Sequence, residues 1–255
     1  MQPLRLLLHL GISSLSSNDN QQNNSTMKRS FFFLAIMAFI SNITFAQFQK
    51  EFNVSNFNGL EISNAFVVEV HQGASFKVVA HGESKEDLAN LRITTSGKTL
   101  TAKFNSSNWS WGGHKSIRLD ITMPTIQSLD FSGAVKANVV GFNDLENLNI
   151  VLSGASKTTI NTNADKISAE VSGASKLILQ GKCGKFNLEA SGASHVEASN
   201  LQARDADIEA SGASHANIYA LKTLDADASG ASKITYRGNP AIRQESSGAS
   251  SIRGN

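Results

Sequence analysis

Apolar and polar positions in the C-terminal half of the chain alternate in phase with a repeated tetrapeptide, Ser-Gly-Ala-Ser. When the copies are aligned on the glycine, positions an even number of residues away are mostly apolar on both sides. Two residues before the glycine, for example, the series is Phe131, Leu152, Val171, Ala190, Ala210, Ala228 and Ser246. Side chains of a strand point alternately to opposite faces, so this pattern predicts a strand on each side of every glycine, with the even positions facing inward.

The tetrapeptide recurs with a period of 18–21 residues, and its first copy is imperfect. The repeat glycines are Gly133, Gly154, Gly173, Gly192, Gly212, Gly230 and Gly248. A short period with strand patterning is typical of a solenoid, in which each repeat stacks on the next. We therefore predict an all-β fold over residues 126–255, a parallel β-helix (β-solenoid) with about seven rungs of 18–21 residues. Each glycine is expected to bend the chain at a corner.

Some polar residues also fall at inward positions of this alignment. The serine two residues after the glycine is expected to hydrogen-bond from one rung to the next. Gln127 occupies the position six residues before the first glycine, and Gln244 and Ser246 lie at inward positions of the last rung. We expect Gln244 and Ser246 to form a cap, because an open β-edge would invite end-to-end pairing.

The outward, odd positions carry two columns of charge. Three residues before the glycine most side chains are acidic, among them Glu170, Glu189 and Glu209. The column three residues after the glycine contains Lys136, Lys157, Lys176, His195, His215 and Lys233. This stripe is either a surface for an anionic polysaccharide or a solvated face that the nearby acidic column neutralises. Pairing with neighbouring Lys, or bridging by calcium, would relieve repulsion in the acidic column.

Residues 47–125 also show strand patterns, in a less regular arrangement that we expect to be continuous with the solenoid. The predicted strands cover residues 52–62, 65–70, 76–80, 91–104 and 117–123. Ser84 is a candidate helix cap, and the residues around Gly97 suggest a hairpin turn. Trp109 and Trp111 lie in a stretch rich in Ser, Asn and Gly that we interpret as a loop tip. They could stack on a sugar or fold back as a lid.

The N-terminal 46 residues predict export. Residues 27–46 combine a basic start, an apolar run over residues 31–40 and small residues before Gln47, which is the layout of a signal peptide cleaved between Ala46 and Gln47. We expect translation to begin at Met27 and residues 1–26 to be a start-site artefact or disordered. No membrane span is expected once the signal is removed, and we expect the protein to be secreted, periplasmic or on the outer cell surface.

Charge and composition narrow the function. The formal net charge of +2 belongs to the leader, because residues 47–255 hold 20 basic and 20 acidic residues. A neutral chain lacks the basic footprint of a nucleic-acid binder. The single cysteine, Cys183, excludes a disulfide framework, and no His-Asn or His-Asp arrangement suggests a catalytic thiol. His195 and His215 lack a third nearby ligand, so neither a metal nor another cofactor is predicted.

The segments Phe52-Asn53-Val54, Gly59-Leu60-Glu61-Ile62 and His71-Gln72-Gly73, together with the tetrapeptide copies, resemble the auto-transporter adhesin head GIN domain family over residues 48–255. The resemblance implies a right-handed parallel β-helix, found mainly in Bacteroidetes-type bacteria, and a role in adhesion. It brings no catalytic residues.

We therefore predict a secreted or cell-envelope, adhesin-like protein that is not an enzyme and that presents surfaces for adhesion or scaffolding. Its partner would be a glycan or a cell-surface protein. A glycan-binding module that uses Trp109, Trp111 and the Lys/His stripe is the alternative. A polysaccharide-acting enzyme is disfavoured, because rungs of 18–21 residues leave no room for the loops that build a cleft.

Overall fold

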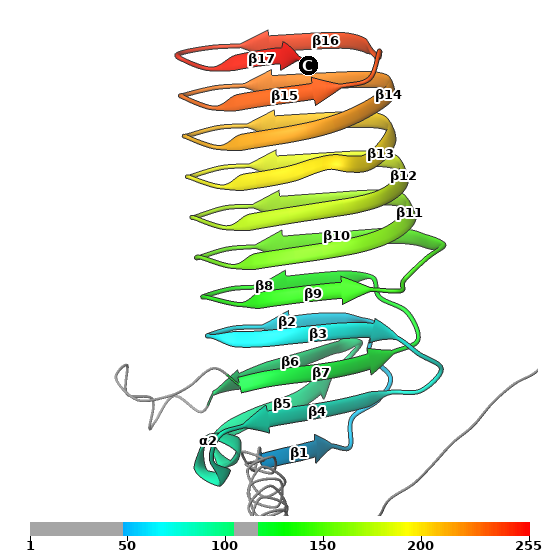
Figure 1. Ribbon diagram of the computed structural model, residues 1–255, viewed down its shortest axis with the longest axis vertical. Helices are drawn as coiled ribbons and strands as arrows, with labels where there is room; N and C mark the ends of the chain where they lie inside the picture. Colours follow the sequence, from blue (N-terminus) through cyan, green and yellow to red (C-terminus); the bar gives the residue numbers. More distant parts are fainter. Residues whose placement is uncertain (1–47, 105–116) are drawn as a thin grey trace, which may run out of the picture. The chain divides into compact units, whose positions relative to one another are not determined.

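The computed structural model describes residues 48–104 and 117–255, all within one compact unit, and they form a β-solenoid. Its elements are β1 (Phe48–Phe52), β2 (Gly59–Ile62), β3 (Phe66–Gln72), β4 (Lys77–Gly82), α2 (Lys85–Ala89), β5 (Leu91–Ser96), β6 (Thr99–Phe104), β7 (Ile117–Met123), β8 (Ser128–Phe131), β9 (Lys136–Val140), β10 (Leu145–Leu152), β11 (Lys157–Val171), β12 (Lys176–Ala190), β13 (His195–Ala210), β14 (His215–Ala228), β15 (Lys233–Arg237), β16 (Ala241–Ser246) and β17 (Ser251–Gly254). The predicted all-β solenoid is confirmed, and its coils rise as a right-handed helix (Figure 1).

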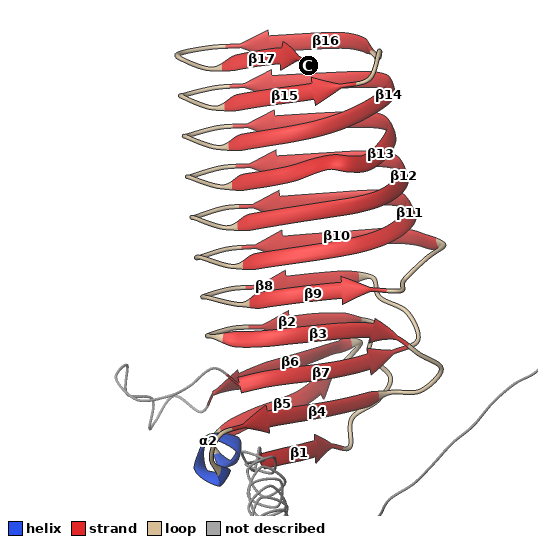
Figure 2. Ribbon diagram, viewed as in Figure 1, coloured by secondary structure: helices blue, strands red, loops and turns tan. Residues whose placement is uncertain are grey.

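Each regular coil has two flat faces that meet at a sharp turn (Figure 2). The strand before the repeat glycine belongs to the rear face of Figure 1, which contains β2, β8, β10, the second halves of β11–β14 and β16. The strand after it belongs to the front face, which contains β3, β9, the first halves of β11–β14, β15 and β17. We call the row of repeat glycines the glycine edge. Strands of successive coils pair in parallel on both faces.

The glycine edge explains why the repeat requires glycine. Every repeat glycine has a positive φ between 68° and 80°, a backbone conformation that strains other residues. The turns also stack closely, because the Ala174 N–H donates to the carbonyl of Gly154 at 2.7 Å. A Cβ atom on Gly173 would lie 2.5 Å from that same oxygen. The predicted corner is therefore confirmed, and both conformation and space select glycine.

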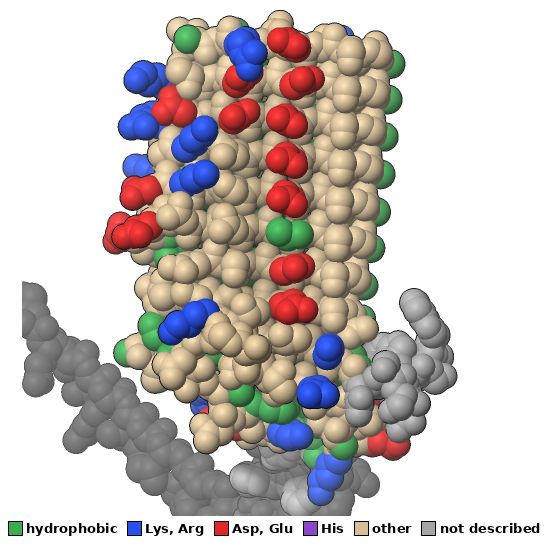
Figure 3. Space-filling model, turned by 180° about the vertical axis from the view of Figure 1, so that it is seen from behind, with side chains coloured by type: hydrophobic (Ala, Val, Ile, Leu, Met, Phe, Trp, Pro, Cys, Tyr) green, Lys and Arg blue, Asp and Glu red, His purple; other side chains and the backbone are tan. Residues whose placement is uncertain are grey.

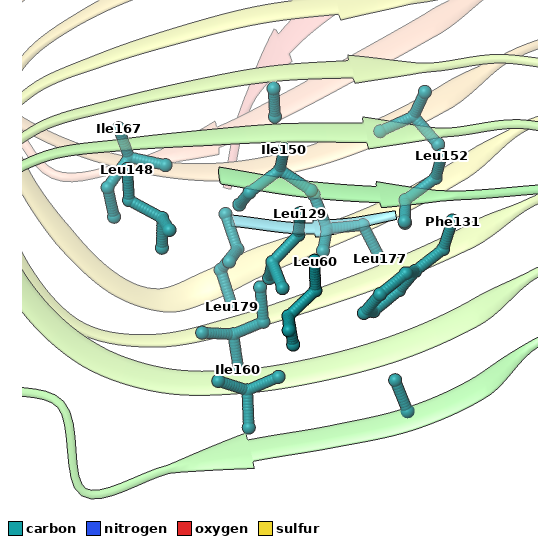
Figure 4. Close-up of a cluster of buried hydrophobic side chains, with 14 of the residues drawn as sticks. Leu60, Leu129, Phe131, Leu148, Ile150, Leu152, Ile160, Ile167, Leu177 and Leu179 are labelled. Carbon is teal, nitrogen blue, oxygen red and sulfur yellow. The ribbon is translucent and has the colours of Figure 1, made fainter. Parts of the chain in front are cut away.

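The even positions form the core, as predicted. Leu129 and Ile150 from the rear face point into the same interior as Ile160 and Leu179 from the front face (Figure 4). Apart from the last coil, Gln127 is the exception: its side chain is exposed, and the neighbouring Ile126 is fully buried in its place. The alternation of inward and outward side chains shifts by one residue before β8. Ile126 therefore points inward in place of Gln127, because neighbouring strand residues face opposite sides.

Some of the serines two residues after the glycine bond between coils as expected, although their partners are backbone carbonyls of the preceding coil. The Ser232 hydroxyl donates to the carbonyl oxygen of Ala210 at 2.9 Å, and the Ser214 hydroxyl to that of Ala190 at 3.2 Å. The equivalent hydroxyls of Ser175 and Ser194 are buried and have no hydrogen-bond partner. Small side chains at this position keep the interior beside the turn filled.

The N-terminal part stacks out of sequence order. β2 pairs in parallel with both β6 and β8, and β3 pairs in parallel with both β7 and β9. The β2–β3 coil therefore lies between the β6–β7 coil and the β8–β9 coil (Figure 1). Asn64 takes the place of the glycine at its turn, with φ of 82°. The expected strand over residues 52–62 is two strands, β1 and β2, with non-strand residues between them.

The outermost N-terminal strands and the single helix of the described residues complete this end. β4 pairs antiparallel with β1 and β7, and β5 and β6 form the predicted hairpin at Gly97. The predicted cap is also present, because the hydroxyl of Ser84 accepts a hydrogen bond from the Asp87 N–H at the start of α2. The antiparallel strands end the run of parallel coils here.

At the other end, all six residues of β16 are exposed, including Gln244 and Ser246. Ile242, which continues an inward column, is 39% exposed. Within residues 48–104 and 117–255, no helix has both the length and the apolar character that a membrane span requires.

Candidate functional site

A ladder of acidic side chains runs along the rear face. Its members occupy matched positions on neighbouring strands, three residues before each turn. We define this acidic ladder as Glu61, Asp130, Glu170, Glu189, Glu209, Asp227 and Glu245. Figure 3 shows it as a vertical row of carboxylates, interrupted once by Val151. Paired strands lie about 4.8 Å apart, so the ladder repeats at about that interval.

A second ladder, of cationic side chains, runs along the front face. Strand register places each member beside the next, three residues after each turn. This Lys/His ladder contains all six residues that the sequence singled out: Lys136, Lys157, Lys176, His195, His215 and Lys233. The ring centroids of His195 and His215 are 6.4 Å apart. The solenoid thus assembles these residues into one continuous column.

The two ladders lie on opposite faces, which overturns the expectation that Glu170, Glu189 and Glu209 pair with neighbouring lysines. No ion pair found among the described residues joins a member of one ladder to a member of the other. The reason is the glycine corner, which sends the chain from the rear face to the front face within the tetrapeptide. The neutralising effect of each column on the other is correspondingly weak.

Two pKa shifts along the ladders have partial burial as their largest cause and nearby like charges as a further cause. Partial burial, the neighbouring Lys176 and His215 together lower the pKa of His195, although Glu197 opposes them. Partial burial and the negative charge of Glu61 raise the pKa of Asp130. Each shift favours the neutral form of a group that stands beside charges of the same sign.

The structure adds polar clusters that the sequence analysis missed. On the front face, Glu197 accepts hydrogen bonds from Ser199 and from Asn217 Nδ2, the latter at 2.8 Å. Burial alone would raise the pKa of Glu197, but these hydrogen bonds lower it. With Tyr236 and Arg237, these residues line a shallow pocket of about 240 Å³. The sequence signal for this pocket is the column five residues after the repeat glycine, which contains Glu197 and Asn217.

A wider groove of about 590 Å³ lies on the rear face beside the acidic ladder, near the C-terminal coils. Arg243 lines this groove and pairs with the carboxylate of Asp225. The Thr223 hydroxyl donates to Asp205 Oδ1 at 2.7 Å. These residues fall in columns five and seven residues before the glycine, next to the acidic ladder.

The remaining candidates from the sequence are a metal site, Cys183 and the two tryptophans. Across the two described ranges, no group of three or more His, Cys, Asp and Glu side chains is arranged to hold a metal ion. Cys183 is buried, and burial raises the pKa of its thiol to about 12. Trp109 and Trp111 fall within residues 105–116, outside the described residues.

The fold and the two ladders together define the class of protein: a β-solenoid with two flat faces, each of which carries one column of like charge, acidic on the rear face and cationic on the front face. A family model described as "Putative auto-transporter adhesin, head GIN domain" matches residues 56–240. The chain belongs to this family, as its sequence resemblance suggested.

Solved structures share the fold at low sequence identity. A "putative adhesin" from Bacteroides fragilis superposes with a TM-score of 0.74 at 19% identity, over 82% of this chain and 97% of that chain. A "Putative lipid binding protein" from Parabacteroides distasonis gives 0.64 at 16% identity, over 82% and 96%. A "putative adhesin" from Parabacteroides merdae gives 0.63 at 14% identity, over 82% and 96%. Among curated proteins, no significant match is found.

Proposed function

We propose that this protein is an adhesin-like, non-enzymatic protein of the cell envelope or of the secreted fraction, and that it acts by presenting its solenoid faces. The observation that carries the proposal is the pair of flat sheet faces, each with a long column of like charge. Chemistry normally requires convergent groups in a cleft, whereas adhesion requires extended, accessible surface. Family membership and the adhesin descriptions of the solved relatives support the same conclusion.

Location provides the first test, because an adhesin must be accessible from outside the cell. We expect an antibody against the solenoid to label intact cells that express the full chain in their own host. An antibody against a cytoplasmic protein would control for leakage. Labelling that appears only after the envelope is permeabilised would overturn an adhesive role.

The ligand class that best fits the structure is an extended anionic polysaccharide, bound along the Lys/His ladder. Cations spaced at about 4.8 Å along a straight column suit a linear polymer with an acidic group on each of its sugar units. The polar cluster around Glu197 and Asn217 lies on the same face and offers donors and acceptors for sugar hydroxyls. A glycan-binding role is therefore the second candidate, and it would supply the adhesive contact.

Matched charge variants test the ligand class. The triple variant Lys157→Gln, Lys176→Gln, Lys233→Gln removes three ladder cations, whereas Lys77→Gln, Lys166→Gln, Lys185→Gln removes three cations from outside the ladder. We expect the ladder variant to bind heparin and chondroitin sulfate at least about tenfold more weakly at low salt, with the control variant close to wild type. Neutral dextran serves as the negative probe. Equal losses in both variants would show attraction by net charge alone and would remove the ladder as a site.

A further inference from the structure

The two ladders are related in a way that adhesion to a glycan does not require. The acidic residues stand three positions before a turn, and the cationic residues stand three positions after one. The two columns therefore lie at equal distances from the glycine edge, on opposite faces. Five coils carry both charges: Asp130 with Lys136, Glu170 with Lys176, Glu189 with His195, Glu209 with His215, and Asp227 with Lys233.

We propose that copies of this chain associate face to back, with the acidic ladder of one copy against the Lys/His ladder of the next. The occupant of each sheet face is thus a second copy of the chain. Charge complementarity carries the proposal, since the two columns have opposite sign, the same repeat and the same position along the coils. Within the chain the ladders do not neutralise each other, because no ion pair in the described part connects them.

The geometry of such a pair is simple. A translation perpendicular to the faces, without rotation, brings the front face of one copy over the rear face of another. Both columns then run along the same edge, and every coil meets its counterpart. Packed sheet faces lie about 10 Å apart, which is a distance that a lysine and a glutamate side chain can bridge together. Because the two contacting surfaces differ, the arrangement is heterologous and each added copy leaves a free face at both ends.

The expected strength follows from the exposure of the ladders. Exposed ion pairs are individually weak and are screened by salt, and association also loses translational freedom. We therefore expect weak association, with a dissociation constant on the order of 100 µM at low salt. Crowding of many copies on one surface would make such contacts effective, as in any multivalent array. An anionic polymer on the Lys/His ladder would compete with the second copy for the same face.

A charge-reversal pair gives the decisive test. In one variant the acidic ladder becomes cationic through Glu170→Lys, Glu189→Lys and Glu209→Lys. In the other, the Lys/His ladder becomes acidic through Lys157→Glu, Lys176→Glu and Lys233→Glu. We expect the wild-type full chain to form dimers and larger species in sedimentation velocity at 20 mM NaCl and to be monomeric at 500 mM NaCl. Each variant alone should remain monomeric at 20 mM NaCl, and an equimolar mixture should associate again.

Two controls keep the test specific. Glu51→Lys, Glu146→Lys, Asp165→Lys makes the same change in net charge as the Glu→Lys ladder variant with exposed residues outside the ladder, and should still associate at 20 mM NaCl. Circular dichroism establishes that each variant is folded. If the Glu→Lys variant is not, the neutral variant Glu170→Gln, Glu189→Gln, Glu209→Gln replaces it and should be monomeric at 20 mM NaCl. A wild-type chain that is monomeric at low salt and millimolar concentration overturns the proposal, as does a mixture that fails to associate. Neither result bears on heparin binding by the monomer, which the Lys→Gln variants measure separately.

Discussion

The first and last coils of the solenoid share the same turn but fill their interiors very differently. Two residues before the glycine, the side chain shrinks from Phe131 through Leu152 and Val171 to alanine in the following coils. The turns do not change with it. The alanine N–H after each repeat glycine donates to the preceding turn at 2.7–2.8 Å in every coil.

This comparison indicates that backbone stacking sets the coil, while side-chain volume sets how much each coil contributes to stability. Hydrophobic stabilisation scales with the apolar area buried, so coils lined with Phe and Leu contribute more than coils lined with Ala. In a solenoid each coil contacts only its neighbours, so stability is approximately a sum of local terms. We therefore expect the free energy of unfolding to be concentrated in the N-terminal coils.

The largest effect is expected in the first repeat coil. Phe131→Ala removes a fully buried aromatic ring and should lower the free energy of unfolding by about 3–5 kcal/mol. Ser246→Ala, at the same column in the exposed coil of β16, is the matched control and should change it by less than about 0.5 kcal/mol. Urea denaturation measures both. Similar losses at the two positions would contradict a graded interior.

The next effect concerns the turns. Gly173→Ala combines a positive φ with a Cβ atom 2.5 Å from the Gly154 oxygen, and should cost about 2 kcal/mol or more. At Gly97 φ is also positive, but no atom lies within 4 Å of a new Cβ atom. Gly97→Ala therefore measures the cost of the backbone conformation alone, about 1 kcal/mol of the free energy of unfolding. Gly248→Ala, where the coil of β16 and β17 can shift more easily, should fall between them. The order would be wrong if Gly97→Ala proved the most damaging.

A smaller effect separates bonded from unbonded serines. Ser232→Ala removes a buried hydroxyl that donates to Ala210 and should cost about 1 kcal/mol. Ser194→Ala removes a buried hydroxyl without a partner, so it should be neutral or slightly stabilising. Thermal unfolding of the two variants, side by side, measures the difference. A greater loss for Ser194→Ala would mean that its hydroxyl does have a partner in solution.

The smallest expected effect is a pH dependence of stability that arises from His195, in the C-terminal half of the Lys/His ladder. The pKa of His195 is lower in the folded chain than its ordinary value of 6.5, so the unfolded chain binds the proton more readily. Stability that is present above pH 6.5 should therefore decline as the pH falls below it. His195→Gln should reduce this decline, measured as the melting temperature between pH 8 and pH 5.5. His71→Gln, on β3, is the control, and a profile that His195→Gln leaves unchanged would refute the assignment.

Much of this architecture could be predicted from local pattern. The alternation around each glycine correctly assigned buried and exposed positions in β10 to β14, and the tetrapeptide correctly indicated a corner. Gln127 was misassigned because a chain can change phase by one residue in a connection, and the alignment could not register that change. The pocket around Glu197 was missed because its residues come from four different coils.

The sequence by itself determined the coil period, the glycine corner and the direction in which most side chains point, because these depend on residues close together in the chain. Only the tertiary structure decided that the β2–β3 coil is inserted between β6–β7 and β8–β9, since that order depends on hydrogen bonds between strands far apart in sequence. The tertiary structure also decided that the two ladders face away from each other. Five residues, including the turn, separate their members, and the direction of the turn places one charge on each face.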